Sequence, residues 1–286
     1  MPRLLLVGSS RDSRTDNLNR LCRAFHRSGW LVEKCEHNGI WLEGSQLLTS
    51  TAEHGVIDIE RFDLIWLLGF GSHTTFLDRM QLLRWCEQGK FVNSISSFVY
   101  LHNKAAVNMT PLGKHAPYSI STDNVNTLLD RIKQGGSWIV KPTAGSFGRD
   151  VFALTNNDPN LCQIIEHVTR QGYVLLQEKV STSNEKRWML IQGEILGVYE
   201  KVKVGLRGNV AANAKAKLCE PKVEEQVLVQ HIAADLLELG IRACAIDVAY
   251  PYLLDVNFVN PGWFQTMEAL TGEDLSRHVP ALFAAS

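Results

Sequence analysis

A short strand, a lysine, a glycine-containing loop and a second strand follow one another between residues 138 and 154. The β-branched run Trp138-Ile139-Val140 predicts the first strand, and Val151-Phe152-Ala153-Leu154 predicts its partner. Lys141 ends the first strand, and the loop contains Gly145-Ser146-Phe147-Gly148. Such a loop can hold a polyphosphate, because the lysine supplies charge and glycines let backbone N–H groups approach phosphate oxygens. It is not a P-loop, and an ordinary turn has the same composition, so this stretch alone leaves both interpretations open.

The composition is that of a globular protein, with 45% hydrophobic and 21% charged residues among 286. A net charge of −1 gives no broad field for nucleic acid or a membrane surface. The apolar runs are too short to span a bilayer. Six scattered cysteines without a C-x-x-C pair are typical of free thiols in a reducing compartment. We therefore expect a cytoplasmic protein without nucleic-acid or membrane partners.

The first hundred residues alternate between apolar strands and amphipathic helices, which predicts a parallel sheet with helices on its faces. Strands are expected at 4–7, 31–35, 62–68 and 91–93, and helices at 16–28, 77–88 and 94–107. The segment 37–58 is polar and is expected to be irregular. The turn after the first strand lacks the glycine fingerprint of a dinucleotide-binding fold, which argues against a NAD site.

The rest of the chain predicts two further groups of strands and helices. Strands near 118–120 and 173–177, with helices capped by Thr122 or Asp123 and over 158–170, surround the opening stretch. Strands at 187–192 and 195–203 form a hairpin at Gly193-Glu194, and a helix covers 224–239. Strands at 244–249 and 253–258 are joined by a short turn at 250–252. The basic segment from Lys201 to Lys217 is either a solvated surface or a lid.

Asp247, Asp255 and Asn257 form the most informative set of polar residues. Asp255 and Asn257 are two apart on one predicted strand, so their side chains share a face. Asp247 lies on the neighbouring strand of the same predicted hairpin. Two carboxylates and an amide oxygen on paired strands are suitable ligands for a hard cation such as Mg²⁺. The alternative is a set of carboxylates that face solvent.

These parts, in this order, resemble the ATP-grasp superfamily. The resemblance rests on Lys104, Lys141 with its loop, Gln177-Glu178-Lys179-Val180, Arg187, and Asp247 with Asp255-x-Asn257. It is nearest to bacterial glutathione synthetase and to the related ligases that add glutamate to protein C-termini. It implies an α/β protein with an α+β C-terminal part. A Rossmann-like pre-ATP-grasp domain would cover 1–115, a small subdomain with the phosphate loop 116–178, and a C-terminal subdomain with the metal and acceptor site 179–286.

The resemblance also implies a role for each matching position. Lys104 and Lys141 would contact the nucleotide phosphates. The loop Gly145, Ser146, Phe147 and Gly148 would close over the phosphates, and the hinge Gln177, Glu178, Lys179 and Val180 would bind adenine. Glu185 would contact the ribose. The residues near the transferring phosphate would be Arg187, Arg207 and Asn209, and the metal ligands would be Asp247, Asp255 and Asn257.

The sequence departs from the family pattern at a metal ligand, at the mobile loop and in a segment that contributes to the acceptor pocket in the family. Asp255 stands where the family more commonly has Glu. The segment 201–207 is shorter than the mobile loop of glutathione synthetase, which leaves open whether it still closes as a lid. Val259-Asn260-Pro261-Gly262-Trp263-Phe264 replaces that enzyme's Thr-Ser-Pro-Thr pattern. Trp263 and Phe264 are core aromatics by default, with an apolar wall of the acceptor site as the alternative.

The function implied is ATP- and Mg²⁺-dependent ligation of a carboxylate to an amine through an acyl phosphate, with Mn²⁺ as an alternative ion. The substrates would be small molecules or peptides, and the nearest family members form homo-oligomers. The other hypothesis is an ATP-binding regulatory protein of the same fold without turnover. The identities of the carboxylate and the amine are left open.

Overall fold

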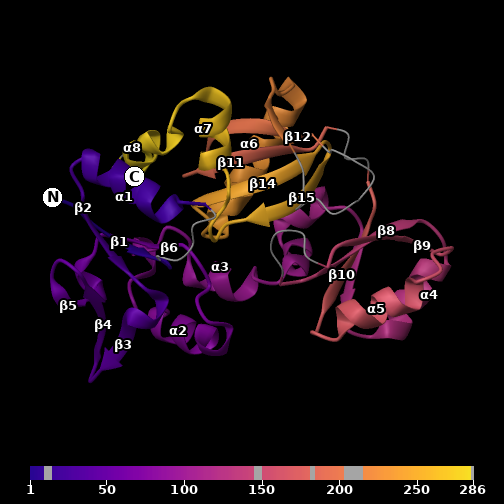
Figure 1. Cartoon of the computed structure of the whole chain (residues 1–286), viewed down its shortest axis with the longest axis horizontal. Coiled ribbons are helices and arrows are strands. Elements are labelled where there is room, and N and C mark those ends of the chain that lie inside the picture. The colour runs from indigo at the N-terminus through magenta and orange to yellow at the C-terminus, as the bar shows by residue number, and fades with distance from the viewer. Residues whose placement is uncertain (10–14, 145–149, 181–183, 203–214, 285–286) are drawn as a thin grey trace.

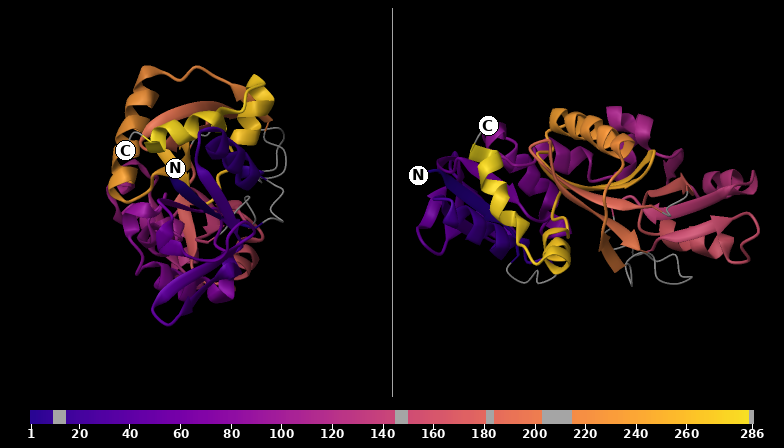
Figure 2. Two further views of the ribbon diagram at one scale, coloured as in Figure 1. Left: turned by 90° about the vertical axis from the view of Figure 1, so that its left-hand side faces the viewer. Right: turned by 90° about the horizontal axis from the view of Figure 1, so that it is seen from above.

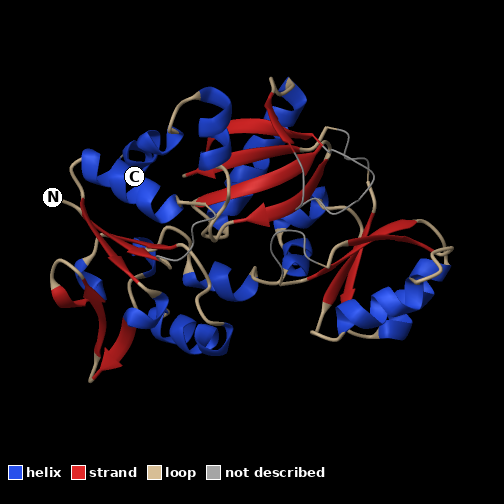
Figure 3. Ribbon diagram, viewed as in Figure 1, coloured by secondary structure: helices blue, strands red, loops and turns tan. Residues whose placement is uncertain are grey.

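The computed structural model describes residues 1–9, 15–144, 150–180, 184–202 and 215–284 (Figure 1). The described strands form four sheets in three groups, because the N-terminal group contains both a parallel sheet and a small antiparallel sheet (Figure 3). Among the described residues, no helix is both long and apolar enough to cross a membrane.

The N-terminal sheet is parallel, as the strand–helix alternation predicts. Strand β1 (Arg3–Val7) lies between β2 (Leu31–Cys35) and β6 (Leu64–Leu67). A parallel bridge between Ile65 and Phe91 extends the sheet beyond β6. The residues from Leu4 to Val7 are fully buried, because helices and neighbouring segments cover both faces of a parallel sheet. Helix α1 (Asn17–Arg27) follows β1, and its N-cap residue Asp16 makes no capping side-chain bond.

The prediction that residues 37–58 are irregular is wrong. They form an antiparallel sheet of β3 (Ile40–Glu43), β4 (Gln46–Thr51) and β5 (Gly55–Asp58). The inward positions of β4 carry Leu47, Thr49 and Thr51, all buried. Threonine favours strands but counts as a polar residue, so two of the three inward positions of β4 did not contribute to the alternation of apolar and polar residues that predicts a strand.

Two predicted helices are shorter than expected. Helix α2 (Phe76–Leu83) ends five residues before the predicted boundary at Gln88. The predicted helix 94–107 is divided into α3 (Ile95–Tyr100) and a 3₁₀ helix (Lys104–Met109), and a second 3₁₀ helix covers Pro111–His115. The division follows from Asn103, whose side chain accepts a bond of 2.9 Å from Ala105 N and starts a new helix there.

The second group of strands is a four-stranded antiparallel sheet with its own hydrophobic core. Its order is β7 (Ser119–Thr122), β10 (Val174–Glu178), β8 (Ser137–Pro142) and β9 (Phe152–Thr155). Helices α4 (Val125–Lys133) and α5 (Leu161–Thr169) pack on it. The predicted cap of α4 at Thr122 or Asp123 is wrong, because Asn124 accepts the capping bond from Thr127 N at 3.0 Å.

The third group is a five-stranded antiparallel sheet at the centre of the molecule. Its order is β13 (Lys215–Leu218), β12 (Glu194–Val202), β11 (Lys186–Ile191), β14 (Ala243–Ala249) and β15 (Tyr252–Asn257). The turn between β11 and β12 lies at Gln192-Gly193, one residue earlier than predicted. Both residues have positive φ, 52° and 78°, as a two-residue hairpin turn requires.

The two faces of the central sheet have different neighbours. Trp188, Leu190 and Ile246 belong to the core cluster that includes helix α6 (Val223–Glu238), which lies along one face (Figure 2). Met189 and Ala245 belong instead to the cluster that contains α7 (Phe264–Thr271). Because side chains alternate along a strand, Arg187 projects to the face opposite Lys186 and Trp188.

The C-terminal end returns to the N-terminal sheet. Helix α8 (Val279–Ala284) lies beside α1, and both termini are at the same end of the molecule (Figures 1 and 2). The ring of Phe283 is 6.2 Å from that of Phe25 and 5.7 Å from that of Trp66, measured between centroids. The first and last segments of the chain therefore share one core, and the division into domains at 115 and 178 stays a prediction.

Candidate active site

The three predicted metal ligands share one face of the hairpin formed by β14 and β15. Asp247 is paired directly with Asp255 across the two strands, and Asn257 is paired with Ala245. Directly opposed residues of an antiparallel pair project to the same side, and so do residues two apart on a strand. The hairpin predicted from alternating polar and apolar residues therefore brings all three side chains together.

Asp247 is held by two cations from its own sheet. Arg187 on β11 donates from Nε to Oδ1 and from Nη2 to Oδ2, both at 2.7 Å, and Lys201 Nζ lies 2.8 Å from Oδ2. Asp247 is only 4% exposed. Burial would raise the pKa of Asp247, but the charges of Arg187 and Lys201 outweigh burial and hold it well below its ordinary value. Burial also opposes the charge of Arg187, yet Asp247 raises the pKa of the guanidinium.

Lys201 is a member of this cluster that the sequence analysis did not single out. It was grouped with the basic segment 201–217, but it lies on β12, where its Nζ also donates to Glu185 Oε1 at 2.8 Å. Its pKa is raised: burial lowers it, and the carboxylates of Asp247 and Glu185 more than compensate. The strand period could have found it, because Tyr199 pairs with Arg187 and Lys201 is two residues further along the same face.

Asp255 is held by cations from outside the central sheet. Lys104 Nζ, from the 3₁₀ helix Lys104–Met109, lies 2.9 Å from Asp255 Oδ1 and 2.7 Å from Oδ2. The side chains of Lys104 and Asp255 are 22% and 21% exposed. Burial would raise the pKa of Asp255, but Lys104 and Lys141 outweigh it and lower the value. The two predicted phosphate-binding lysines thus both lie near the predicted metal ligands.

Lys141 extends from β8 of the second sheet toward β15 of the third. Its Nζ donates to the carbonyl oxygen of Leu254 at 3.3 Å. Burial lowers the pKa of Lys141, and the attraction of Asp255 only partly offsets this effect. Lys141 makes no direct ion pair with a carboxylate of the described residues, so its ammonium is available for an anionic ligand between the two sheets.

The donor set fits a hard divalent cation. Asp247, Asp255 and Asn257 offer oxygen ligands on one face, which is the chemistry that Mg²⁺ selects. Asn257 Nδ2 lies 3.4 Å from Asp255 Oδ2, so the amide and the carboxylate are adjacent. Among the described residues, no group of three or more His, Cys, Asp or Glu could hold a metal ion. The candidate set consists of two carboxylates and one amide.

The predicted hinge lies at the end of β10, beside β8. Gln177 and Glu178 are the last residues of this strand, and Lys179 and Val180 follow it. The backbone N–H of Glu178 bonds to Tyr118 O and that of Lys179 to Ser137 O, both at 2.8 Å. The predicted loop residues Gly145, Ser146, Phe147 and Gly148, and the predicted Arg207 and Asn209, lie outside the described residues.

Helix α1 is hydrogen-bonded to the segment that follows β15, the strand that carries Asp255 and Asn257. Asn17 Nδ2 donates to Asn260 Oδ1 at 2.7 Å and to Pro261 O at 2.9 Å. One turn later, Arg20 pairs with Glu268 of α7, at a distance of 2.6 Å.

Trp263 and Phe264 are fully buried in the shared core. These two aromatics are therefore core residues, and the alternative of an acceptor-pocket wall is not supported.

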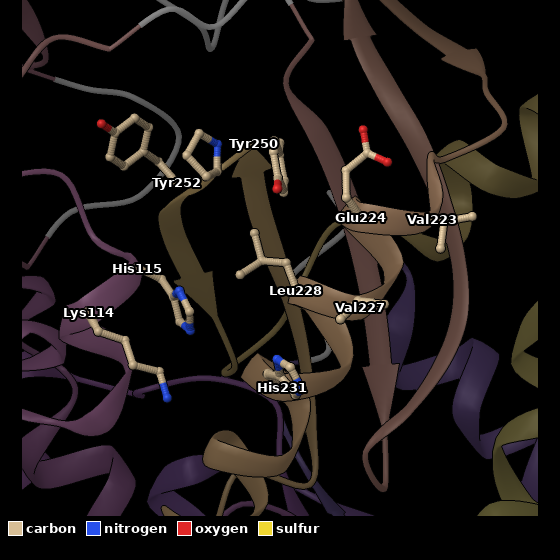
Figure 4. Close-up of a pocket in the computed structure, with 10 residues that line it drawn as sticks. Lys114, His115, Val223, Glu224, Val227, Leu228, His231, Tyr250 and Tyr252 are labelled. Atoms are coloured by element: carbon tan, nitrogen blue, oxygen red, sulfur yellow. The ribbon is translucent and has the colours of Figure 1, made fainter.

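A separate groove of about 630 Å³ lies at the turn between β14 and β15 (Figure 4). It is lined by the first turns of α6, by Tyr250 and Tyr252, and by Lys114 and His115. None of the predicted nucleotide or metal residues is among the described residues that line it. The charged cluster, and not this groove, therefore defines the candidate active site.

A family model for the ATP-grasp domain of prokaryotic glutathione synthetase matches residues 105–272. This range contains both aspartates, Asn257 and the cations of the central sheet. The chain belongs to the prokaryotic glutathione synthetase ATP-grasp family. The ATP-grasp fold expected from the order of motifs is confirmed, and the match begins one residue after Lys104.

Curated glutathione synthetases are similar to this ATP-grasp chain over part of their length. The protein from Thermosynechococcus vestitus is 30% identical over 171 residues, which cover 58% of this chain and 54% of that protein. The protein from Prochlorococcus marinus is 25% identical over 262 residues, covering 88% and 81%. The chain spans about half the length of the first curated relatives it matches.

Solved structures of ATP-grasp proteins share the fold over the whole chain. The D-cycloserine synthetase DcsG superposes with a TM-score of 0.71 at 15% identity and covers 99% of both chains. The macrocyclase MdnC from Microcystis aeruginosa, solved with its precursor peptide MdnA, has a TM-score of 0.71 at 14% identity, covering 99% of this chain and 100% of MdnC. At these identities the similarity establishes the fold alone.

Proposed function

We propose that this ATP-grasp protein is an ATP-dependent carboxylate–amine ligase that acts through an acyl phosphate. The observation that carries the proposal is the convergence of Lys104, Lys141, Arg187 and Lys201 on the two opposed aspartates. Family membership supports it, because the curated relatives are named glutathione synthetases.

In the proposed reaction, a substrate carboxylate oxygen attacks the γ-phosphorus of ATP. The bond to the β–γ bridging oxygen breaks, and ADP leaves. An amine then attacks the acyl carbon, phosphate leaves with the bonding electrons, and the amine loses a proton to give an amide. Each stage concentrates negative charge, so positioning and electrostatic stabilisation supply most of the catalysis, and a nucleophilic side chain is not required.

The cations of the site are suited to different parts of this chemistry. Lys104 and Lys141 reach the site from elements outside the central sheet and would neutralise the non-transferring phosphates. Arg187 and Lys201 are fixed on β11 and β12 and would stabilise the transferring phosphoryl group, and Glu185 keeps Lys201 in place. Lys201 thereby adds a fixed cation to the predicted catalytic set of Arg187, Arg207 and Asn209.

Asp247, Asp255 and Asn257 would hold Mg²⁺, with Mn²⁺ as an alternative. When bound, such an ion neutralises charge on the phosphate oxygens and orients them for transfer. The substrates would be small molecules or peptides that carry a carboxylate and an amine, and the protein would act in the cytoplasm as a homo-oligomer.

The test is Mg²⁺-dependent release of ADP from the purified protein. Pools of amino acids, γ-glutamyl dipeptides and short peptides would be supplied in turn, with Lys141→Ala and Asp255→Ala as variants of the site. Lys114→Ala is the matched control, because Lys114 pairs with Asp235 at 3.2 Å and lines the separate groove. We expect ADP release that depends on one pool. This release should disappear in both site variants and persist in the control.

Two other outcomes would count against this proposal in different ways. Tight binding of ATP without stimulated release in any pool would favour the regulatory ATP-binding protein. Absence of ATP binding would contradict both hypotheses.

A further inference from the structure

Every oxygen of the two site aspartates is already in contact with a protein cation. Arg187 contacts both oxygens of Asp247, and Lys104 contacts both oxygens of Asp255, at distances of 2.7 to 2.9 Å. Lys201 adds a further contact to Asp247 at 2.8 Å. A divalent cation that uses these carboxylates must therefore displace an ammonium or share oxygens with it.

The cations differ in how easily they can leave. Arg187 and Lys201 lie on strands of the same sheet as Asp247, and their side chains are 19% and 11% exposed. Lys104 comes from a 3₁₀ helix outside that sheet, and its side chain is 22% exposed. Its backbone N–H bonds to the carbonyl oxygen of Thr143 at 3.0 Å, directly after β8. Lys104 is thus placed between the second and third sheets, where its flexible side chain can turn to another anion.

Lys141 does not have the same role. Its Nζ bonds to a backbone carbonyl, that of Leu254, and it acts on Asp255 through its charge. Turning Lys104 away would leave the carboxylate of Asp255 with both oxygens free of a direct ion pair, while Lys141 stays near it.

We propose that Lys104 is an internal counter-ion that closes the cation site by pairing with Asp255. A polyphosphate draws the ammonium of Lys104 away, and only then are the oxygens of Asp255 open to a divalent ion. This inference rests on the proposed function, because it places a nucleotide and a metal ion at this site. Divalent-ion binding and nucleotide binding are then positively coupled, and each must strengthen the other by the same factor.

The experiment measures Mn²⁺ binding to the purified protein by electron paramagnetic resonance, with and without a non-hydrolysable ATP analogue. The proteins are wild type, Lys104→Gln, Asp255→Asn and the control Lys114→Gln, each checked for folding by circular dichroism. Asp255→Asn identifies the signal of this site. Lys114→Gln removes a lysine from another lysine–aspartate pair and should behave as wild type.

The expected result has two parts. The analogue tightens Mn²⁺ binding to wild type by about tenfold or more, on the usual scale of coupling between sites. Lys104→Gln binds Mn²⁺ without the analogue about tenfold more tightly than wild type, because the competing ammonium is gone.

Several results would overturn the inference. If ligand-free Lys104→Gln binds Mn²⁺ no more tightly than wild type while the analogue still promotes binding to wild type, the counter-ion role is wrong and the proposed function stands. If wild type binds Mn²⁺ equally well with and without the analogue, the coupling is absent. If wild type binds neither ligand, the proposed function fails together with the inference.

Discussion

The two aspartates of the site are directly opposed on one hairpin, yet they are neutralised in different ways. Asp247 takes its cations from its own sheet: Arg187 lies on β11, which is paired with β14, and Lys201 lies on β12, the next strand after β11. Asp255 takes Lys104 from a 3₁₀ helix and is influenced by Lys141 from another sheet. The first cluster forms with the sheet itself, whereas the second exists only when separate parts of the molecule come together. The comparison teaches that two adjacent carboxylates can depend on different parts of the fold: Asp247 on its own sheet, and Asp255 on how the other elements approach that sheet.

The change with the largest expected effect on stability is Asp247→Asn. It leaves Arg187 and Lys201 buried beside a neutral amide, and removal of one partner of a buried ion pair costs about 3–5 kcal/mol. Urea unfolding followed by circular dichroism measures the loss, and ADP release measures the accompanying loss of activity. A variant as stable as wild type would contradict the assignment of Asp247 to the framework of the sheet.

The second change, Lys186→Met, tests whether the two faces of β11 are independent. Lys186 pairs with Glu225 of α6, and both side chains are buried. Glu225 would keep its bond from Lys222 N at 2.8 Å, so we expect a smaller cost, roughly 2–3 kcal/mol. ADP release per folded molecule should be unchanged, because the side chain projects away from the site. A loss of turnover in fully folded protein would show that the faces are coupled.

The third change, Asp255→Asn, should separate activity from stability. Lys104 is partly exposed and can turn to water, and the repulsion between the two aspartates disappears, so the cost should be only about 1 kcal/mol. ADP release should nevertheless fall by roughly a hundredfold or more, because the site loses a carboxylate. Equal losses of stability in Asp255→Asn and Asp247→Asn would remove the distinction between the two clusters.

The smallest expected effect is the pH dependence of the Asp255 contribution. The folded state lowers the pKa of Asp255 from its ordinary value of 3.8. The unfolded chain therefore takes up the proton first as pH falls, so the stabilisation is complete above about pH 5 and declines below about pH 4. The difference in unfolding free energy between wild type and Asp255→Asn should therefore be constant above about pH 5 and should become smaller as the pH falls below about 4. A difference that does not change with pH would show that the carboxylate contributes no charge-dependent stability.

The sequence predicts the ligand-bearing hairpin well, because Asp247, Asp255 and Asn257 alternate with apolar residues in a period of two. It also places Lys104 and Lys141 in one site, through the order of motifs. It does not reveal which cation neutralises which carboxylate, because that depends on how the separate sheets approach each other. Lys201 was missed for a different reason. It stands at the start of the basic segment 201–217, and the composition of that segment drew attention away from the strand period that directs Lys201 toward Asp247.

Other errors in the predicted elements arise where individual polar side chains, and not the hydrophobic periodicity of the segment, decide the local structure. The buried threonines of β4 made a regular sheet look irregular. A single asparagine, Asn103, caps the start of a new helix at Lys104, inside the range expected to be one helix, and so helps to place a residue of the site. Side-chain caps of this kind are decided by one hydrogen bond, so hydrophobic periodicity over many residues cannot locate them.

The contacts of helix α1 have a consequence for the order in which the protein can be made. Arg20 and Glu268 are 248 positions apart in the chain, and Asn17 is 243 and 244 positions from its partners Asn260 and Pro261. On the ribosome, the N-terminal sheet emerges first, but Phe25 and Trp66 remain uncovered until Phe283 has been synthesised. The core around Phe25 therefore cannot be completed until the segment that contains Phe283 has been made.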